Sequence, residues 1–388
     1  MNGLFWLLRP ILPGRGPEPN MAKDDLPAEE NPFEPRRNDA LLGHEEAEKT
    51  ILDAWNSKRM HHAWLLCGPK GVGKATLAYR MARFILSGGG ENGGAGLFGD
   101  QNDGLYVDPE DPVARRIAGG GHGDLKVVER QYDDKKKRLQ GEITVANVRT
   151  VGNFMSKTSA EGGWRIVIVD AADELNRNAA NAILKVLEEP PANAMMILVA
   201  HHPGRLLPTI RSRCRRLNLG PLEDHQVVDL LGRYCPDMDL GARDALSGLA
   251  EGSIGRALQL HDVGGLELYT DLVNIIAALP NADVAAQHKF AERFSPADKD
   301  AAFATITELM HWWLARMIRF AATGQPPREV VDGELPAMQR MAAAQPLDQW
   351  LEVWEKINEL MGATRGLHLD RKQALLNAFF MLEETMRT

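Results

Sequence analysis

The stretch Trp164–Pro191 reads WRIVIVDAADELNRNAANAILKVLEEPP, and it decides the fold. Its first part, Ile166–Val169, is an unbroken β-branched run that ends at Asp170. Such a run predicts a strand buried on both faces, as in a parallel sheet, with one carboxylate at its C-terminal edge. Asn176 is placed to cap a following helix, which the closing Pro-Pro pair ends. A strand ending in Asp is also where a P-loop protein holds magnesium.

Two acidic residues, Glu188 and Glu189, end this predicted helix. The helix dipole disfavours each of them there by roughly 0.3–1 kcal/mol. The conflict indicates either cationic neighbours or a helix end that is open to solvent.

Composition limits the classes of protein to consider. A chain of 388 residues is long enough for two or three domains. A net charge of −8 argues against a general, sequence-independent grip on DNA. The three cysteines, at positions 67, 214 and 235, are too few and too widely spaced for a disulfide framework or a CxxC zinc cluster, which fits a reducing cytosol. An apolar run of about 20 residues, as a membrane-spanning helix needs, is absent from the sequence.

Residues 1–40 are expected to be disordered or spurious. The apolar start MNGLFWLLRPILPGRG is interrupted by Arg9 and Pro10, and a small-residue cleavage site of a signal peptide does not follow it. Met21 opens a more polar stretch, and we interpret it as an alternative start of the protein.

A glycine-rich loop, GPKGVGKAT, follows the apolar run Ala63–Cys67 and precedes helical text. Strand, loop and helix in this order are the context in which such a loop binds phosphate. Three glycines would let backbone N–H groups surround a polyphosphate, and Lys74 would reach its outer phosphates. These candidate residues are Gly68, Gly71, Gly73 and Lys74.

The loop departs from the P-loop pattern at its last position. Ala75 stands where a hydroxyl should bind magnesium, and Thr76 points about 100° further round the helix. Two interpretations stay open: a degenerate loop that only packs, or one that binds nucleotide without efficient hydrolysis.

Three further stretches carry weaker signals. Residues 87–138 are rich in glycine and aspartate, with one candidate strand at Leu125–Val128 and a tetrabasic run at Lys135–Arg138 that we interpret as a solvated loop rather than a nucleic-acid contact. The adjacent histidines after the apolar run Met195–Ala200 lack a spaced third metal ligand. Five arginines between Arg205 and Arg216 form the densest positive cluster.

The order of GPKGVGK, VIVDAADELNRNAANAILKVLEEPP and IRSRC resembles the clamp-loader branch of the AAA+ ATPases, and within it the delta-prime family of bacterial DNA polymerase III. The likeness runs from about Leu41 to Leu260. It implies an α/β P-loop AAA+ domain, a parallel sheet flanked by helices, followed by a small helical lid and an all-α collar-like domain.

Against the active members of this family, four positions lack their functional groups. The resemblance places a water-polarising glutamate, a polar sensor and a sensor arginine where this chain carries smaller residues, and Asp173 and Glu174 lie too far along the loop to substitute. The lost positions are Ala75, Ala171, Ala200 and Gly255. The degenerate nucleotide site would therefore be Gly68, Gly71, Gly73, Lys74, Thr76 and Asp170, with weak binding of ATP or ADP and magnesium at most.

The SRC motif, Ser212-Arg213-Cys214, is intact. The resemblance implies that Arg213 is an arginine finger that acts on the nucleotide of a neighbouring subunit; the alternative is a local pair between Arg213 and a carboxylate. The family's zinc module, a four-cysteine insertion, has no cysteines at its place in residues 87–138, so zinc is not expected.

The predicted domains are an AAA+ P-loop domain over residues 41–220, with the 87–138 insertion, a helical lid over 221–265, and a helical C-terminal oligomerisation domain over 266–388. Apolar residues recur at helical spacing in the last of these, for example Met310, Trp313 and Met317. A Pro-rich break at 324–336 divides it.

The resemblance implies a cytoplasmic subunit of the replicative clamp loader that hydrolyses little ATP itself. Its partners would be motor and delta-type subunits and, indirectly, the sliding clamp and primer-template DNA, with no membrane. Two alternatives stay open: an ATP-hydrolysing motor subunit or other autonomous AAA+ ATPase, and a general nucleic-acid-binding P-loop module.

Overall fold

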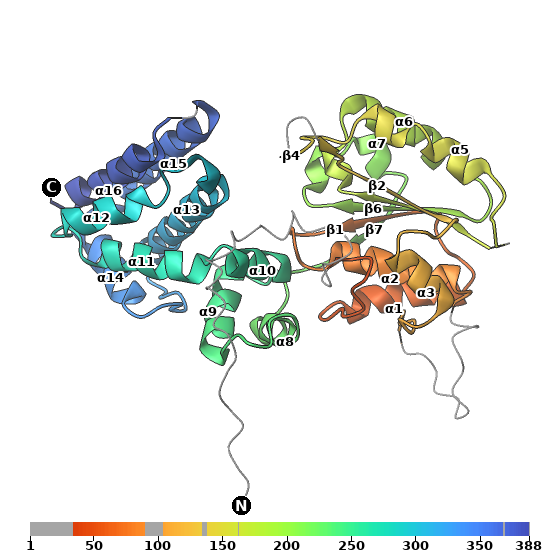
Figure 1. The fold of residues 1–388 in the computed structure, drawn as a ribbon, viewed down its shortest axis with the longest axis horizontal. Helices are drawn as coiled ribbons and strands as arrows, with labels where there is room; N and C mark the ends of the chain where they lie inside the picture. The colour runs from red at the N-terminus through yellow and green to blue at the C-terminus, as the bar shows by residue number, and fades with distance from the viewer. Residues whose placement is uncertain (1–33, 90–103, 134–137, 162, 368, 388) are drawn as a thin grey trace, which may run out of the picture.

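The computed structural model describes residues 34–89, 104–133, 138–161, 163–367 and 369–387. Residues 1–33, most of the predicted N-terminal extension, therefore lie outside the described part. So do residues 90–103 and three residues of the tetrabasic run. Figure 1 shows an α/β part that contains the sheet, a group of three short helices next to it, and a bundle of longer helices at the C-terminal end.

Five parallel strands form the main sheet in the order β2-β5-β6-β1-β7. The strands are β1 (Ala63–Cys67), β2 (Leu125–Glu129), β5 (Arg165–Asp170), β6 (Ala194–Ala200) and β7 (Arg215–Asn218). The central strands β6 and β1 are buried along their whole length, whereas β7, at one edge, is mostly exposed. Continuous apolar runs without alternation are what a parallel sheet covered on both faces requires. The predicted α/β fold class is confirmed.

Helices cover both faces of this sheet (Figure 1). One face carries α1 (Glu45–Asn56), α2 (Lys74–Leu86) and α3 (Pro112–Ala118). The other face carries α4 (Val145–Val148), α5 (Val151–Ser156), α6 (Arg177–Glu188) and α7 (Pro208–Arg211). Alternate residues of β5 serve the two layers: Ile168 packs with the α2 side and Val169 with the α6 side. This alternation gives the sheet two separate hydrophobic layers.

Residues 87–138 contribute to the core more than their composition indicates. Leu105 and Ile117 are buried against α2, and β2 forms the far edge of the sheet. A short hairpin, β3 (Tyr132–Asp133) with β4 (Arg138–Leu139), follows. The candidate strand at Leu125–Val128 is confirmed. The stretch is thus only partly an insertion, because it supplies one of the five strands.

The lid comprises α8 (Asp224–Tyr234), α9 (Leu240–Ala250) and α10 (Ile254–Asp262). Asp239 caps α9 by accepting a bond from the backbone N–H of Ala242 at 3.0 Å. Glu223 caps α8, and its neighbour Asp224 occupies the first helical position.

The C-terminal part is entirely helical. Its elements are α11 (Gly265–Ala277), α12 (Val284–Glu292), α13 (Asp300–Thr323), α14 (Glu334–Ala344), α15 (Leu347–Leu367) and α16 (Arg371–Arg387), with short 3₁₀ turns at Ala297–Lys299 and, in the α/β part, at Ala172–Glu174 and Pro203–Arg205. Met310, Trp313 and Met317 are buried, so this apolar stripe belongs to the core. The same continuous core includes lid residues such as Leu230 and Leu249.

A loop between α13 and α14 fastens the lid to the C-terminal helices. Arg328 in this loop forms ion pairs with Asp224 of α8 and, at 2.6 Å, with Asp244 of α9. The loop itself is held by Arg316, which donates to the carbonyl of Arg328, and by Glu334, which accepts from the backbone N–H of Val330 at 2.8 Å.

Residues 34–40 tie the lid to the α/β part from the other side. Arg83 of α2 donates to the carbonyl of Asn38 at 2.8 Å, and Arg80 to that of Asp39 at 2.7 Å. The side chain of Asn38 in turn donates to the hydroxyl of Tyr234, the last residue of α8, at 2.8 Å. The folded chain therefore starts before Leu41, where we predicted its beginning. None of the described helices has the length and apolarity needed to span a membrane.

Candidate functional site

The glycine-rich loop lies at the C-terminal edge of the sheet, between β1 and α2. Parallel strands end at the same edge, so the loop, Asp170 at the end of β5 and Ala200 at the end of β6 lie close together. The sequence predicted this group, and the fold assembles it.

The loop needs its glycines. Gly68, Gly71 and Gly73 have φ values of 148°, 79° and 103°, a region that side chains disfavour. At Gly68 a Cβ atom would lie 2.1 Å from the carbonyl oxygen of Leu219. The curled backbone of a phosphate loop is thus retained despite the missing hydroxyl at Ala75.

Lys74 is turned back into the loop. Its side-chain Nζ donates to the carbonyl of Gly68 at 2.8 Å and to that of Pro69 at 2.5 Å, and the residue is 3% exposed. Burial lowers the pKa of Lys74 to about 8, and the nearby carboxylate of Asp170 opposes that shift. To reach a phosphate, the ammonium group would have to leave both carbonyls.

All five carbonyls from Gly68 to Val72 accept hydrogen bonds from protein donors. Lys74 holds the first two. Ser253 Oγ donates to Lys70 at 2.8 Å, the backbone N–H of Gly255 to Gly71 at 3.0 Å, and His44 Nε2 lies 2.6 Å from the carbonyl of Val72. Two of these donors belong to the start of α10, so the lid is hydrogen-bonded directly to the loop.

Gly255 is required for this contact. A Cβ atom there would lie 2.8 Å from the Cα of Gly71, and backbone cannot yield as a flexible side chain can. Arg256, one residue on, turns instead to Glu308 of α13, 3.2 Å away. A sensor arginine at position 255 is therefore incompatible with the observed packing.

We predict that Gly255→Ala lowers the free energy of unfolding by about 1–3 kcal/mol, because the added methyl group overpacks the contact between lid and loop. Thermal or urea unfolding measures the change. Gly362→Ala is the matched control: it also lies within a helix, and nothing lies within 4 Å of its added Cβ. Equal effects of the two substitutions would contradict the proposed contact.

Asp170 lies next to the loop in a largely buried position. Burial raises the pKa of its carboxyl to about 6, and Glu129 adds to the rise while Lys74 opposes it. Thr76, the remaining hydroxyl nearby in sequence, is 7% exposed and belongs to the buried face of α2. Asp170 and Lys74 are thus opposite charges beside the phosphate loop.

The raised pKa of Asp170 predicts a pH-dependent stability. The folded state disfavours its ionised form, so the contribution of this group is largest below about pH 4 and is lost as pH rises through about 6. Asp170→Asn should therefore stabilise the protein by about 1–3 kcal/mol at pH 7 and by much less at pH 4, without magnesium present. Urea unfolding of both proteins across this range tests it. A difference independent of pH would contradict it.

The two acidic residues after Asp170 serve the local structure. Asp173 accepts from the backbone N–H groups of His201 and His202, both at 2.9 Å, and Glu174 pairs with Arg130 at 2.7 Å. Both carboxylates are therefore engaged by local partners. Ala171, in that position, and Ala200 are both buried and apolar.

His201 and His202, the adjacent histidines after β6, are held by Asp173 through their backbone N–H groups. Burial, with the nearby charge of Lys74, lowers the pKa of His201 to about 4, so its ring stays neutral at pH 7. The described residues contain no group of three His, Cys, Asp or Glu side chains that could hold a metal ion.

Arg213 lies away from this group, just before the start of β7. β1 and β7 are parallel, with Trp64 opposite Arg215 and Cys67 opposite Asn218. The SRC motif precedes β7 and therefore lies at the N-terminal ends of these strands, whereas the phosphate loop follows β1 at their C-terminal ends. The length of the intervening strand is about 13 Å. Arg213 therefore does not belong to the nucleotide site of its own chain.

In the isolated chain Arg213 contacts local groups. Its guanidinium is 2.9 Å from Oε1 of Glu188 and donates to the carbonyl of Thr209 at 3.0 Å. Of the two interpretations of Glu188 at the end of α6, the cationic neighbour is observed, and the side chain is also exposed. Cys214 is half-buried, and burial raises the pKa of its thiol to about 12, so it is not a reactive thiolate at pH 7. The arginine-finger role of Arg213 stays a prediction.

Sequence reasoning missed His44 and Ser253. Both bind carbonyls of the phosphate loop, from 28 and 183 residues away in the chain. A local sequence pattern cannot indicate such pairs.

Residues 43–223 match the family model described as DNA polymerase III, delta subunit. The delta-prime subunit of Pseudomonas aeruginosa DNA polymerase III is 34% identical over 58% of this chain and 63% of its own length. The delta-prime subunit of Escherichia coli is 30% identical over 60% of this chain and 64% of its length, and that of Bacillus subtilis 33% over 47% and 49%.

The chain thus spans about half to just under two thirds of the length of these curated relatives. Among solved structures, a gamma-subunit-related protein of Thermotoga maritima is 19% identical and covers 89% of this chain and 100% of its own, with a TM-score of 0.36. The RuvB branch-migration motor of the same organism is 15% identical over 83% and 90%, with a TM-score of 0.39. Residues 43–223, which carry the phosphate loop and the SRC motif, are thus similar in sequence to delta and delta-prime subunits of bacterial DNA polymerase III.

Proposed function

We propose that this chain is the delta-prime subunit of a bacterial clamp loader and that it hydrolyses little or no ATP itself. The sequence similarity of residues 43–223 to delta and delta-prime subunits supports the first part. The second part rests on one observation: the lid is hydrogen-bonded onto a phosphate loop whose lysine is bound to the loop's own carbonyls.

Four groups that hydrolysis uses in the family are also missing. Ala75, Ala171, Ala200 and Gly255 stand at the positions for metal, water and γ-phosphate. Phosphoryl transfer depends on positioning and charge stabilisation, so the loss of several such groups together removes most of the rate. Retained backbone N–H groups, Lys74 and Asp170 are compatible with weak binding of ATP or ADP and magnesium. Zinc binding is not expected.

The partners we propose are the motor and delta-type subunits of the loader and, through them, the sliding clamp and primer-template DNA in the cytoplasm. The chain is also similar to tau subunits; for example, it is 28% identical to that of Escherichia coli over 57% of this chain and 32% of the tau subunit. The C-terminal helices would form the oligomerisation domain. Leu351 of α15 and Phe380 of α16 are exposed apolar residues there, 42% and 61% accessible.

The experiment that tests this proposal compares ATP hydrolysis by the purified chain and by the reconstituted loader. We expect the chain alone to turn over far below 1 s⁻¹, and the complete loader to require it for clamp loading. A turnover on the order of 1 s⁻¹ by the chain alone would favour the alternative of an autonomous ATPase. Tight, steeply salt-dependent binding of the isolated chain to primed DNA would favour a nucleic-acid module instead.

A further inference from the structure

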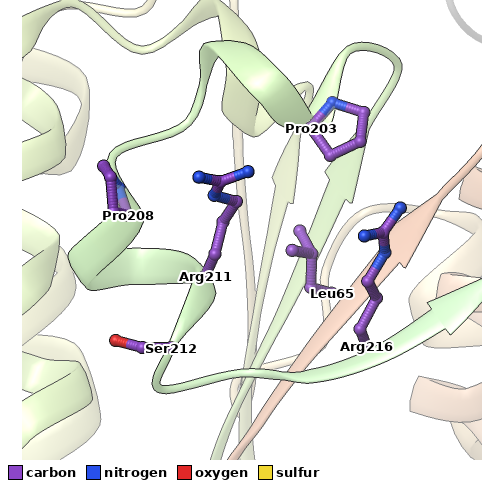
Figure 2. Close-up of a pocket in the computed structure, with 6 residues that line it drawn as sticks. All are labelled: Leu65, Pro203, Pro208, Arg211, Ser212 and Arg216. Carbon is purple, nitrogen blue, oxygen red and sulfur yellow. The ribbon is translucent and has the colours of Figure 1, made fainter.

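A small hollow lies beside the SRC motif, at the edge of the sheet. Its volume is about 340 Å³, and its lining residues come from β1, β7, α7 and the turn before α7. They are Leu65, Pro203, Pro208, Arg211, Ser212 and Arg216. In Figure 2 Leu65 lies between the two arginine side chains, whose guanidinium groups both extend toward Pro203.

The hollow carries two positive charges and no acidic lining residue. Among the described residues neither arginine has a carboxylate partner: Arg211 has no side-chain bond, and Arg216 donates from Nε to Asn218 at 2.8 Å. Both are exposed. Both guanidinium groups line one hollow without a counter-charge, so an anion bound in the hollow would be stabilised.

Arg213 does not contribute to this hollow. Its guanidinium is paired with Glu188 of α6, and it is not among the lining residues. Arg215 is also occupied, since its guanidinium lies 4.8 Å from the ring centre of Trp64. Arg211 and Arg216 are thus a separate pair within the arginine-rich stretch.

We propose that this hollow binds an acidic segment of an adjacent clamp-loader subunit, with a carboxylate between Arg211 and Arg216 and an apolar side chain against the prolines. The proposal rests on the proposed function, because the hollow adjoins the edge that would face a neighbour. It assigns a docking contact that is distinct from any action of Arg213 on nucleotide.

The lining favours a protein segment over other anions. Half of it is apolar, and Leu65 at its base is 1% exposed, so a ligand with an apolar part gains burial as well as charge pairing. Pro203 and Pro208 restrict the backbone that lines the hollow before a ligand binds, which lowers the conformational entropy lost on binding. A nucleic-acid backbone needs a continuous cationic track, and the chain as a whole carries −8.

The test uses the full chain and the purified tau or gamma subunit of the same organism. The affinity of this pair is measured for Arg211→Gln, Arg216→Gln, the double variant and Arg59→Gln, a control at an exposed arginine outside the hollow. We expect about tenfold weaker binding for each single variant, a larger loss for the double variant and no change for the control. Arg211→Lys should recover part of the affinity, since it restores charge without the planar fork.

Arg211→Gln is not expected to impair folding, because this exposed side chain makes no hydrogen bond or ion pair among the described residues. A loss of affinity in this variant therefore reports on binding. Binding within twofold of wild type for the double variant, while wild type binds the subunit, would overturn the hollow and leave the proposed function standing. Wild type that binds neither subunit would overturn both. Loss of primed-DNA binding with unchanged subunit affinity would assign the hollow to nucleic acid and overturn the proposal.

Discussion

Replacing Arg213 with alanine should slow ATP hydrolysis at the adjoining subunit's site about 10³-fold or more within the assembled loader. An arginine finger stabilises charge on the transferring phosphoryl group, and alanine cannot. Arg213 lies at the opposite end of β7 from its own phosphate loop, so in the proposed assembly it would act on a partner's site. A side-chain exposure of 36% leaves it accessible to a neighbour.

Rapid-quench measurement of the first turnover is the suitable assay, since only the site facing Arg213 is affected. Glu188→Gln separates the finger from a local structural role, because it removes the partner of Arg213 and leaves the guanidinium. We expect this variant to keep the rapid turnover. If Arg213→Ala and Glu188→Gln behave alike, or if Arg213→Ala hydrolyses ATP normally in the loader, the finger assignment is wrong.

The second large effect concerns a buried charge cluster in the C-terminal helices, formed by Tyr269, Arg316 and Glu334. Glu334 is 1% exposed and accepts hydrogen bonds from the hydroxyl of Tyr269 and the guanidinium of Arg316. Burial and the Glu334 charge raise the pKa of the Tyr269 hydroxyl, which therefore stays a donor. The guanidinium also lies 4.2 Å from the ring centre of Trp312.

Arg316→Met is expected to destabilise the protein by about 3–5 kcal/mol, because it leaves the Glu334 carboxylate buried without a counter-charge. It also releases the loop whose Arg328 binds the lid. Thermal unfolding at pH 7 measures the loss. The double variant Arg316→Met and Glu334→Leu should recover part of it, since the uncompensated charge is gone. A loss below about 1 kcal/mol for the single variant would contradict the argument.

The sequence predicted the elements that are specified locally. The run Ile166–Val169 lies within β5, and Asn176 accepts from the backbone N–H of Ala179 at 2.9 Å as the cap of α6. Such features depend on residues a few positions apart, so a single sequence contains them. The cap of α8 is less well specified, because the adjacent carboxylates Glu223 and Asp224 offer the same chemistry and only the fold decides for Glu223.

The glycine loop and Asp170 were also predictable, because one motif and one strand end place them. The bonds that hold the loop were not. His44 and Ser253 meet it only after the chain has folded, and the contact between Gly71 and Gly255 depends on the docking of the lid. Position 255 looked like a lost function, whereas the fold shows that it needs the absence of a side chain.

The lid is joined to the α/β part at three separate places. They are the covalent link before α8, the bonds from the start of α10 to the phosphate loop, and the bond from Asn38 to Tyr234. With the covalent link alone, the lid could rotate relative to the α/β part. The two sets of hydrogen bonds away from that link oppose such a rotation. A movement of the C-terminal helices, whose core continues into the lid, would then be passed on to the α/β part that carries the SRC motif.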